Sequence, residues 1–249
     1  MARQYVLTQG QPQRYKVISR YPSYHGCTLG ALAITGYAPM TAPFDPMMQR
    51  MPKVPAPRAY LDGLDPDDPA TGLHYANMLE AKILEEGAET VLAFVVEPVG
   101  GASTGALVPP AGYMQRIREI CTQYGVLLIH DEVMTGGGRT GRFFGAEHWD
   151  VTPDLIAISK GFGAGYVPLG AMLARDDIVE AVMGGGGGAL TKKAALVGPA
   201  PPRISDRKPR LWRGSGRDPF SREVRARSAA GCWRSRGSAS TTGPGSATG

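Results

Sequence analysis

Three short, continuous apolar runs constrain the fold more than any other feature of the chain. They occupy residues 91–96, 126–129 and 155–158. Apolar runs of this length without alternation are typical of strands that are buried on both faces of a sheet. Helical spacing of apolar residues occurs in the segments 73–87 and 110–125. Because strands alternate with helices, the sequence predicts an α/β fold with a doubly wound, mostly parallel sheet.

Each of the two expected helices carries its apolar residues on one face. In the second helix, Pro110 suits a helix start and Gly125 a C-terminal cap, and the apolar positions are Tyr113, Ile117, Ile120 and Cys121. In the first helix they are Leu73, Ala76, Leu79, Ala81, Ile83 and Leu84. The segment 38–68 is rich in Pro, Met and Asp and shows no period, so we expect a long surface excursion there.

Polar side chains follow each of the three apolar runs. Glu97 comes directly after the first run, Asp131 two residues after the second and Lys160 two residues after the third. In doubly wound sheets, ligands bind outside the carboxyl ends of the strands. We therefore expect these three side chains to lie near a ligand.

Lys160 is the most informative of the three residues. Taken alone, a lysine after a buried strand is usually a solvated loop residue. Here glycines follow it at positions 161, 163 and 165, which would let a bulky planar ligand approach the backbone. A lysine amine can form a Schiff base with the aldehyde of pyridoxal phosphate, and an aspartate can pair with its pyridine nitrogen. With Asp131 one strand earlier, the pattern favours a pyridoxal phosphate site.

Neighbours of these residues offer further candidates. Asp131 and Glu132 must point to opposite faces of a strand, and we assign Asp131 to the cofactor. Val133 then lies on the same side as Asp131 and could pack against the cofactor ring. Tyr24 lies in a glycine-flanked polar turn and is either part of the core or a platform stacked on a flat cofactor. The histidines are scattered singly, so we expect no metal site.

A glycine cluster at 136–141 formally matches the dinucleotide-binding pattern G-x-G-x-x-G after a strand. Two acids precede it and would repel a pyrophosphate, and no amphipathic helix follows it. The match is therefore weak.

Charge divides the chain into two unlike parts, which we take as domains 1–188 and 189–249. The second part holds 13 Lys and Arg against 3 Asp and Glu, and it accounts for the net charge of +5. Only 7 of its 61 residues are Leu, Ile, Val or Phe, below the ~20% needed for a folded core, so we expect a disordered tail. It is either a genuine basic tail that contacts nucleic acid or an acidic surface, or the product of a wrong reading frame in a GC-rich gene.

The first part is acidic, and we do not expect it to bind nucleic acid. Three cysteines without metal-ligand spacing suit a reducing compartment. The N-terminus lacks a signal-peptide pattern, and no apolar run approaches the roughly 20 residues of a membrane span. We therefore expect a cytoplasmic protein.

Over residues 2–183 the chain resembles the class III (omega-type) aminotransferases, which are pyridoxal phosphate enzymes of fold type I. The segments that carry the resemblance are SYHGCTLGA (23–31), VVEPV (95–99), LIHDEVMTG (128–136), GRTGR (138–142), EHW (147–149), TPDLIAISK (152–160) and YVPLG (166–170).

The resemblance implies a role for each candidate residue. Lys160 would carry the internal aldimine and move the proton between substrate and cofactor, and Asp131 would pair with the pyridine nitrogen. Val133 and Tyr24 would cover the two ring faces, and Glu97 matches a family glutamate near the substrate side. The implied reaction moves an amino group from an amine or omega-amino acid to a 2-oxo acid. The implied assembly is a homodimer.

Parts of the family pattern are missing. A glycine-serine phosphate loop would precede residues 2–5, and a threonine loop and a small C-terminal domain would follow Met183. Because charge-assisted phosphate contacts contribute ~1.5–3 kcal/mol each, we expect this chain to bind the cofactor poorly and to have little or no activity. The alternatives are a mutase or decarboxylase of the same fold, or a non-catalytic protein that binds through its basic tail.

Overall fold

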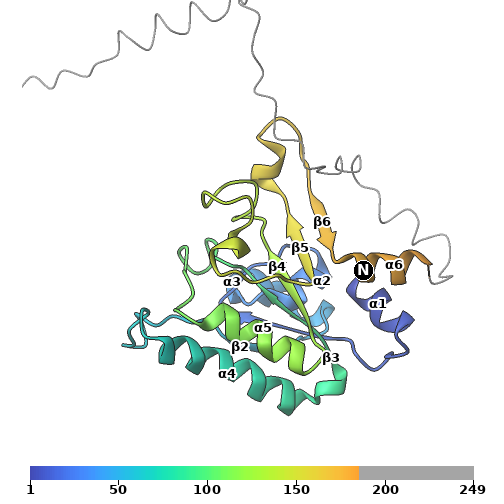
Figure 1. Cartoon of the computed structure of the whole chain (residues 1–249), viewed down its shortest axis with the longest axis horizontal. Helices are drawn as coiled ribbons and strands as arrows, with labels where there is room; N and C mark the ends of the chain where they lie inside the picture. The colour runs from blue at the N-terminus through green and yellow to red at the C-terminus, as the bar shows by residue number, and fades with distance from the viewer. Residues whose placement is uncertain (185–249) are drawn as a thin grey trace, which may run out of the picture. The chain divides into compact units, whose positions relative to one another are not determined.

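The computed structural model describes residues 1–184 (Figure 1). The predicted disorder of 189–249 and the predicted domain boundary at 188 lie outside the described residues. None of the helices in the described part is long and apolar enough to cross a membrane.

A six-stranded sheet forms the centre of the structure, with the strand order β2-β1-β3-β4-β5-β6. All neighbouring strands are parallel except β5 and β6, which are antiparallel. The mostly parallel α/β sheet predicted from the sequence is therefore confirmed. The strands are β1 (Lys16–Tyr21), β2 (Lys53–Pro55), β3 (Val91–Val96), β4 (Leu127–Asp131), β5 (Leu155–Ile158) and β6 (Ala171–Ala174).

Helices cover both faces of this sheet (Figure 1). On one face α4 (Pro69–Glu86) and α5 (Tyr113–Gln123) lie side by side, and they share a core with Phe94 and Leu128. On the other, α1 (Ala2–Thr8) and α6 (Asp176–Gly184) pack over Leu127. The shorter elements are α2 (Leu29–Ile34), α3 (Ala38–Thr41) and the 3₁₀ helices η1 (Ala42–Met47), η2 (Ala88–Thr90), η3 (Gly145–His148) and η4 (Lys160–Gly163).

Burial explains which sequence signals were reliable. Every residue of β3 is buried, as its uninterrupted apolar run predicts. All four apolar positions predicted for the helix at 110–125 are buried in α5. Strand β1 was not predicted, because its apolar residues Val17 and Ile18 are followed by Ser19 and Arg20, both of which are buried.

Two predictions need correction. The segment 38–68 is not only a surface excursion: it contains α3, η1 and β2, and β2 forms the edge of the sheet through parallel pairing with β1. On α4, Leu73, Ala81 and Leu84 are exposed, and the buried positions are Thr71, Gly72, Tyr75, Ala76, Leu79 and Ile83. Gly72 is required there, because an added Cβ would lie 1.9 Å from the backbone oxygen of Ala111.

Asp154 fastens the amino ends of β4 and β5. Its carboxylate accepts a hydrogen bond from the Leu128 backbone at 2.6 Å, and its side chain is almost fully buried. Arg118 of α5 pairs with the same carboxylate at 2.9 Å, and Arg175 pairs with its other oxygen. This ion cluster holds the two strands together at the ends opposite to Asp131 and Lys160.

His130 is a buried titratable group inside the sheet. The side chain is fully buried, and neither ring nitrogen has a hydrogen-bond partner among residues 1–184. Burial, followed by the positive charges of Arg118 and Arg20, lowers the pKa of His130 to about 3. An unfolded histidine takes up a proton near pH 6.5, so unfolding is favoured as the pH falls below that value.

We predict that His130→Leu removes part of the acid sensitivity of the fold. Between pH 6.5 and 4.5, the free energy of unfolding of the unsubstituted chain should fall by roughly 2–3 kcal/mol more than that of the variant. Urea unfolding at several pH values measures the difference. His74→Leu, at an exposed position of α4, is the control and should keep the original pH dependence. Equal pH dependence in the chain and His130→Leu would contradict the prediction.

Candidate active site

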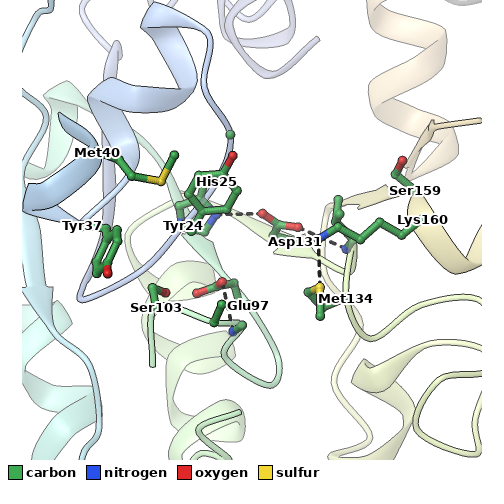
Figure 2. A pocket seen from close by; sticks show the side chains of 14 residues that line it. Tyr24, His25, Tyr37, Met40, Glu97, Ser103, Asp131, Met134, Ser159 and Lys160 are labelled. Carbon is green, nitrogen blue, oxygen red and sulfur yellow. Dashed lines mark hydrogen bonds and ion pairs between the residues drawn. The ribbon is translucent and has the colours of Figure 1, made fainter. Parts of the chain in front are cut away.

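The carboxyl ends of β3, β4 and β5 open into one cavity of about 560 Å³. Glu97, Asp131 and Lys160 follow or end these adjacent strands, and all three side chains line the cavity (Figure 2). Tyr24 and Val133 line it as well. The structure therefore brings together all five residues that the sequence singled out.

Two hydrogen bonds from the protein hold the Asp131 carboxylate. Its Oδ2 lies 2.9 Å from Nδ1 of His25, and its Oδ1 accepts the backbone N–H of Val133 at 3.1 Å. The His25 side chain is only 2% exposed and the Asp131 side chain 14%. Asp131 is thus a nearly buried, oriented carboxylate at the edge of the cavity.

Glu132 points away from this cavity, as the alternation of a strand predicts. Its carboxylate accepts the backbone N–H groups of Gly145 and Ala146, each at 2.8 Å, and the hydroxyl of Thr135. These bonds attach the start of η3 to the end of β4. Glu132 therefore has a structural role, and Asp131 alone of the pair faces the cavity.

Glu97 forms a buried ion pair with Arg20 of β1. Nη2 of Arg20 lies 3.6 Å from Oε2 of Glu97 and donates to the Glu97 backbone oxygen at 2.8 Å. Oε1 accepts the backbone N–H of Gly101 at 3.4 Å, while Oε2 has no hydrogen-bond partner in the described part of the chain. Burial raises the pKa of Glu97 above its ordinary value, and the nearby Arg20 charge opposes that rise.

Lys160 begins η4 directly after β5 and Ser159. Its φ is +45°, a left-handed conformation that non-glycine residues rarely adopt and that costs about 1–3 kcal/mol. The amine donates to the thioether sulfur of Met134 at 2.8 Å, and a thioether is a weak acceptor. Such backbone strain is concentrated at functional sites. Because the Lys160 amine has only a weak hydrogen bond to Met134, a ligand could readily replace that bond.

Figure 2 shows Lys160 and Asp131 reaching toward the same space from neighbouring strands. The far side of the cavity is formed by Tyr37, Met40 and Ser103. A primary amine, a buried carboxylate, an aromatic ring and a branched aliphatic side chain thus share one cavity, whose volume lies in the ~300–1,000 Å³ range of small-molecule sites. This set of groups fits a flat aromatic aldehyde with a ring nitrogen.

Sequence reasoning missed several residues of the site, among them His25, Met134 and Ser159. His25 was given no role, although it is the side chain that contacts Asp131. Met134 and Ser159 also line the cavity, and the Ser159 hydroxyl donates to the Leu169 backbone oxygen at 2.9 Å. The position of His25 beside Tyr24 could have suggested that it lies near the site. Its contact with Asp131, 106 positions away, could not be read from the neighbouring sequence.

Comparison with known proteins identifies the family. The model of the family "Aminotransferase class-III" matches residues 1–192. The chain belongs to the class III aminotransferases.

Individual relatives of this class III chain agree with the match. A putrescine–pyruvate aminotransferase of Pseudomonas aeruginosa is 41% identical over 186 residues, which are 75% of this chain and 41% of that protein. A beta-alanine–pyruvate aminotransferase of the same organism is 40% identical over 74% of this chain and 41% of its own length. The chain therefore spans about two fifths of the length of these curated relatives.

Solved structures of omega-transaminases share the fold. An (S)-enantioselective omega-transaminase from Thermomicrobium roseum superposes with a TM-score of 0.68 at 40% identity, over 74% of this chain and 40% of that chain. An omega-transaminase from Pseudomonas jessenii, solved in complex with PMP, gives a TM-score of 0.69 at 33% identity, over 78% of this chain and 41% of that chain.

We predict that the buried Arg20–Glu97 pair behaves as a unit in this aminotransferase chain. Arg20→Met should lower the free energy of unfolding by about 3–5 kcal/mol at pH 7, because it leaves a buried carboxylate without its cation. Glu97→Gln should cost less, and in the double variant part of the Arg20→Met loss should be recovered. Urea unfolding of the four proteins measures the coupling.

The stability loss caused by Arg20→Met should depend on pH. Because the pKa of Glu97 is raised in the folded state, its protonated form is favoured by folding, and stability is lost as pH rises through that pKa. The penalty of Arg20→Met should therefore shrink as the pH is lowered toward 4. A penalty that is independent of pH and unaffected by Glu97→Gln would show that the two charges are not coupled.

Proposed function

We propose that this chain carries the cofactor-binding site of a pyridoxal phosphate-dependent transaminase. The observation that carries the proposal is the shared cavity of Lys160 and Asp131 at the ends of adjacent parallel strands. When bound, pyridoxal phosphate supplies an electron sink for negative charge that develops at the substrate carbon. The residues of this chain would hold it and move the protons.

Each residue has a proposed role that follows from its position. Lys160 would hold the cofactor through its aldehyde group and would move the proton at the substrate carbon, for which its weakly bonded amine is suited. Asp131 would pair with the ring nitrogen, since its carboxylate is oriented and nearly buried. Tyr24 and Val133 would contact the two faces of the ring. Glu97 would lie toward the substrate.

The proposed substrates are an amine or omega-amino acid as donor and a 2-oxo acid as acceptor. The relatives named for putrescine–pyruvate and beta-alanine–pyruvate exchange support this pair of substrate classes. A mutase or decarboxylase that uses the same cofactor is the alternative. A non-catalytic role through the basic segment 189–249 is the second alternative, and no feature of residues 1–184 favours it.

We also propose that the protein works as a homodimer in the cytoplasm. A cytoplasmic location is supported by Cys27 and Cys121, which are both free in the structure. The dimer is supported by large apolar side chains that are exposed near the glycine-rich segments 136–141 and 161–165. These side chains are Phe143, Phe162, Tyr166 and Val167.

Covalent labelling tests the proposed lysine. Pyridoxal 5′-phosphate is added to the 249-residue chain at increasing concentration, the adduct is reduced with borohydride, and the labelled peptide is mapped by mass spectrometry. We predict labelling at Lys160, its loss in Lys160→Ala, and unchanged labelling in the control Lys82→Ala, whose amine pairs with Glu85 on α4. Label distributed over surface lysines, or retained in Lys160→Ala, would contradict the proposed site.

The reaction type is tested by a single-turnover half-reaction, because we expect this chain to bind the cofactor poorly and to have little steady-state activity. The chain at high concentration is loaded with millimolar cofactor and mixed with a panel of amines and omega-amino acids, and the released carbonyl product is identified by mass spectrometry. Transamination predicts a carbonyl product and an aminated cofactor that a 2-oxo acid converts back. Release of carbon dioxide, or a product isomeric with the donor, would instead favour the decarboxylase or mutase alternative.

A further inference from the structure

Met134 contacts the Lys160 amine, and the proposed function gives it no role. Nζ of Lys160 lies 2.8 Å from the thioether sulfur of Met134. Both side chains line the same cavity, and Figure 2 shows the sulfur next to the amine. Met40 also lines the cavity, but on its far side. Met134 is therefore the methionine whose chemistry can affect the amine directly.

The turn that carries Met134 is anchored to the fold. The backbone N–H of Gly136 donates to the backbone oxygen of Glu132 at 2.8 Å, which closes the turn around Met134. Gly137 then packs against η4, because a Cβ added to it would lie 3.1 Å from the backbone nitrogen of Phe162. The fold therefore holds the Met134 sulfur within reach of the amine at the start of η4.

The Met134 sulfur is accessible to small oxidants, since the residue is 46% exposed. A peroxide oxidises a thioether to a sulfoxide. In this step a lone pair of the sulfur attacks one oxygen of hydrogen peroxide, an S–O bond forms and the O–O bond breaks. The proton on the transferred oxygen passes to the released hydroxide, which leaves as water. The sulfur is oxidised and the peroxide is reduced.

Oxidation would change the group that Lys160 contacts. A thioether is a weak hydrogen-bond acceptor, whereas the oxygen of a sulfoxide is polar and accepts strongly. The added oxygen is bonded to the atom that already lies 2.8 Å from Nζ, and both residues are exposed, so the side chains have room to adjust. A hydrogen bond to the charged form of a group favours that form. The sulfoxide would thus favour the protonated amine, which has no lone pair to attack an aldehyde.

We propose that Met134 is an oxidative modification site that controls the reactivity of the Lys160 amine. As a thioether, Met134 leaves the amine available to an aldehyde. As a sulfoxide, it holds the amine protonated and slows the attack. The modification is reversible, because thiol-dependent reductases return the sulfoxide to the thioether, with water released and a disulfide formed in the reductant. The inference rests on the proposed function only for the identity of the aldehyde.

Reductive methylation tests the effect on the amine without the cofactor. The 249-residue chain is treated with hydrogen peroxide at increasing dose, and formaldehyde and cyanoborohydride are then added at constant pH. Mass spectrometry of the peptides gives the sulfoxide fraction at Met134 and the initial methylation rate at Lys160. We predict that this rate falls about three- to tenfold as the sulfoxide fraction approaches completion. The rate at Lys82, which pairs with Glu85 on α4, is the internal control and should not change.

Matched variants show whether the effect comes from Met134, each compared with its own untreated sample. Met134→Leu keeps an apolar side chain of similar size without sulfur, so peroxide should not slow methylation of Lys160 in it. Met172→Leu removes a methionine of similar exposure, 48%, on β6 and should respond like the unsubstituted chain. Methionine sulfoxide reductases A and B with dithiothreitol should restore the rate. An equal loss in Met134→Leu, or an unchanged rate once Met134 is a sulfoxide, would overturn the proposal.

Labelling with pyridoxal 5′-phosphate and borohydride separates this inference from the proposed function. If the cofactor labels Lys160 selectively and at the same rate with and without the Met134 sulfoxide, the proposed function stands and the modification site fails. If the cofactor shows no selectivity for Lys160 but the sulfoxide slows its methylation, the proposed function fails and the modification site stands. When both hold, oxidation should slow cofactor labelling by the same factor as methylation.

Discussion

The parallel hydrogen bonding of β3, β4 and β5 is the constraint on which the rest of the structure depends. Because the three strands run in one direction, their carboxyl ends meet at one edge of the sheet. Pairing aligns Asp131 with Ala157, so the residues after β5 emerge beside the end of β4. Asp154 and its arginines fasten the opposite ends of β4 and β5. A rigid sheet thus fixes the separation of groups that are far apart in the chain.

Several energetically unfavourable features occur together at the cavity. Lys160 adopts a left-handed backbone conformation, and Glu97 is a carboxylate whose pKa is raised by burial. His25 and Glu97 each present a buried polar atom without a hydrogen-bond partner among residues 1–184. Each of these features costs folding free energy, and their coincidence at one cavity is typical of a functional site.

Much of this arrangement could be predicted from the sequence, and the exceptions have physical causes. Uninterrupted apolar runs revealed β3 and β5, and polar residues at strand ends identified Glu97, Asp131 and Lys160. Strand β1 escaped prediction because Arg20 is polar in sequence but buried in the fold, where it pairs with Glu97. The contact of His25 with Asp131 could not be predicted, because it is set by tertiary packing between a loop and a distant strand. On α4, Leu73 and Leu84 were assigned to the apolar face of the helix but are exposed, because apolar residues are common on protein surfaces.

Membership of the class III aminotransferases agrees with this geometry, while the chain spans only about two fifths of its curated relatives. We propose that the sheet edge itself holds the cofactor between Lys160 and Asp131. A crystal structure of the chain grown with pyridoxal 5′-phosphate tests it most directly. We expect density continuous with the Lys160 amine, with the ring between Tyr24 and Val133 and its nitrogen against Asp131. Density for the cofactor at another place, or with its nitrogen turned away from Asp131, would disprove this arrangement.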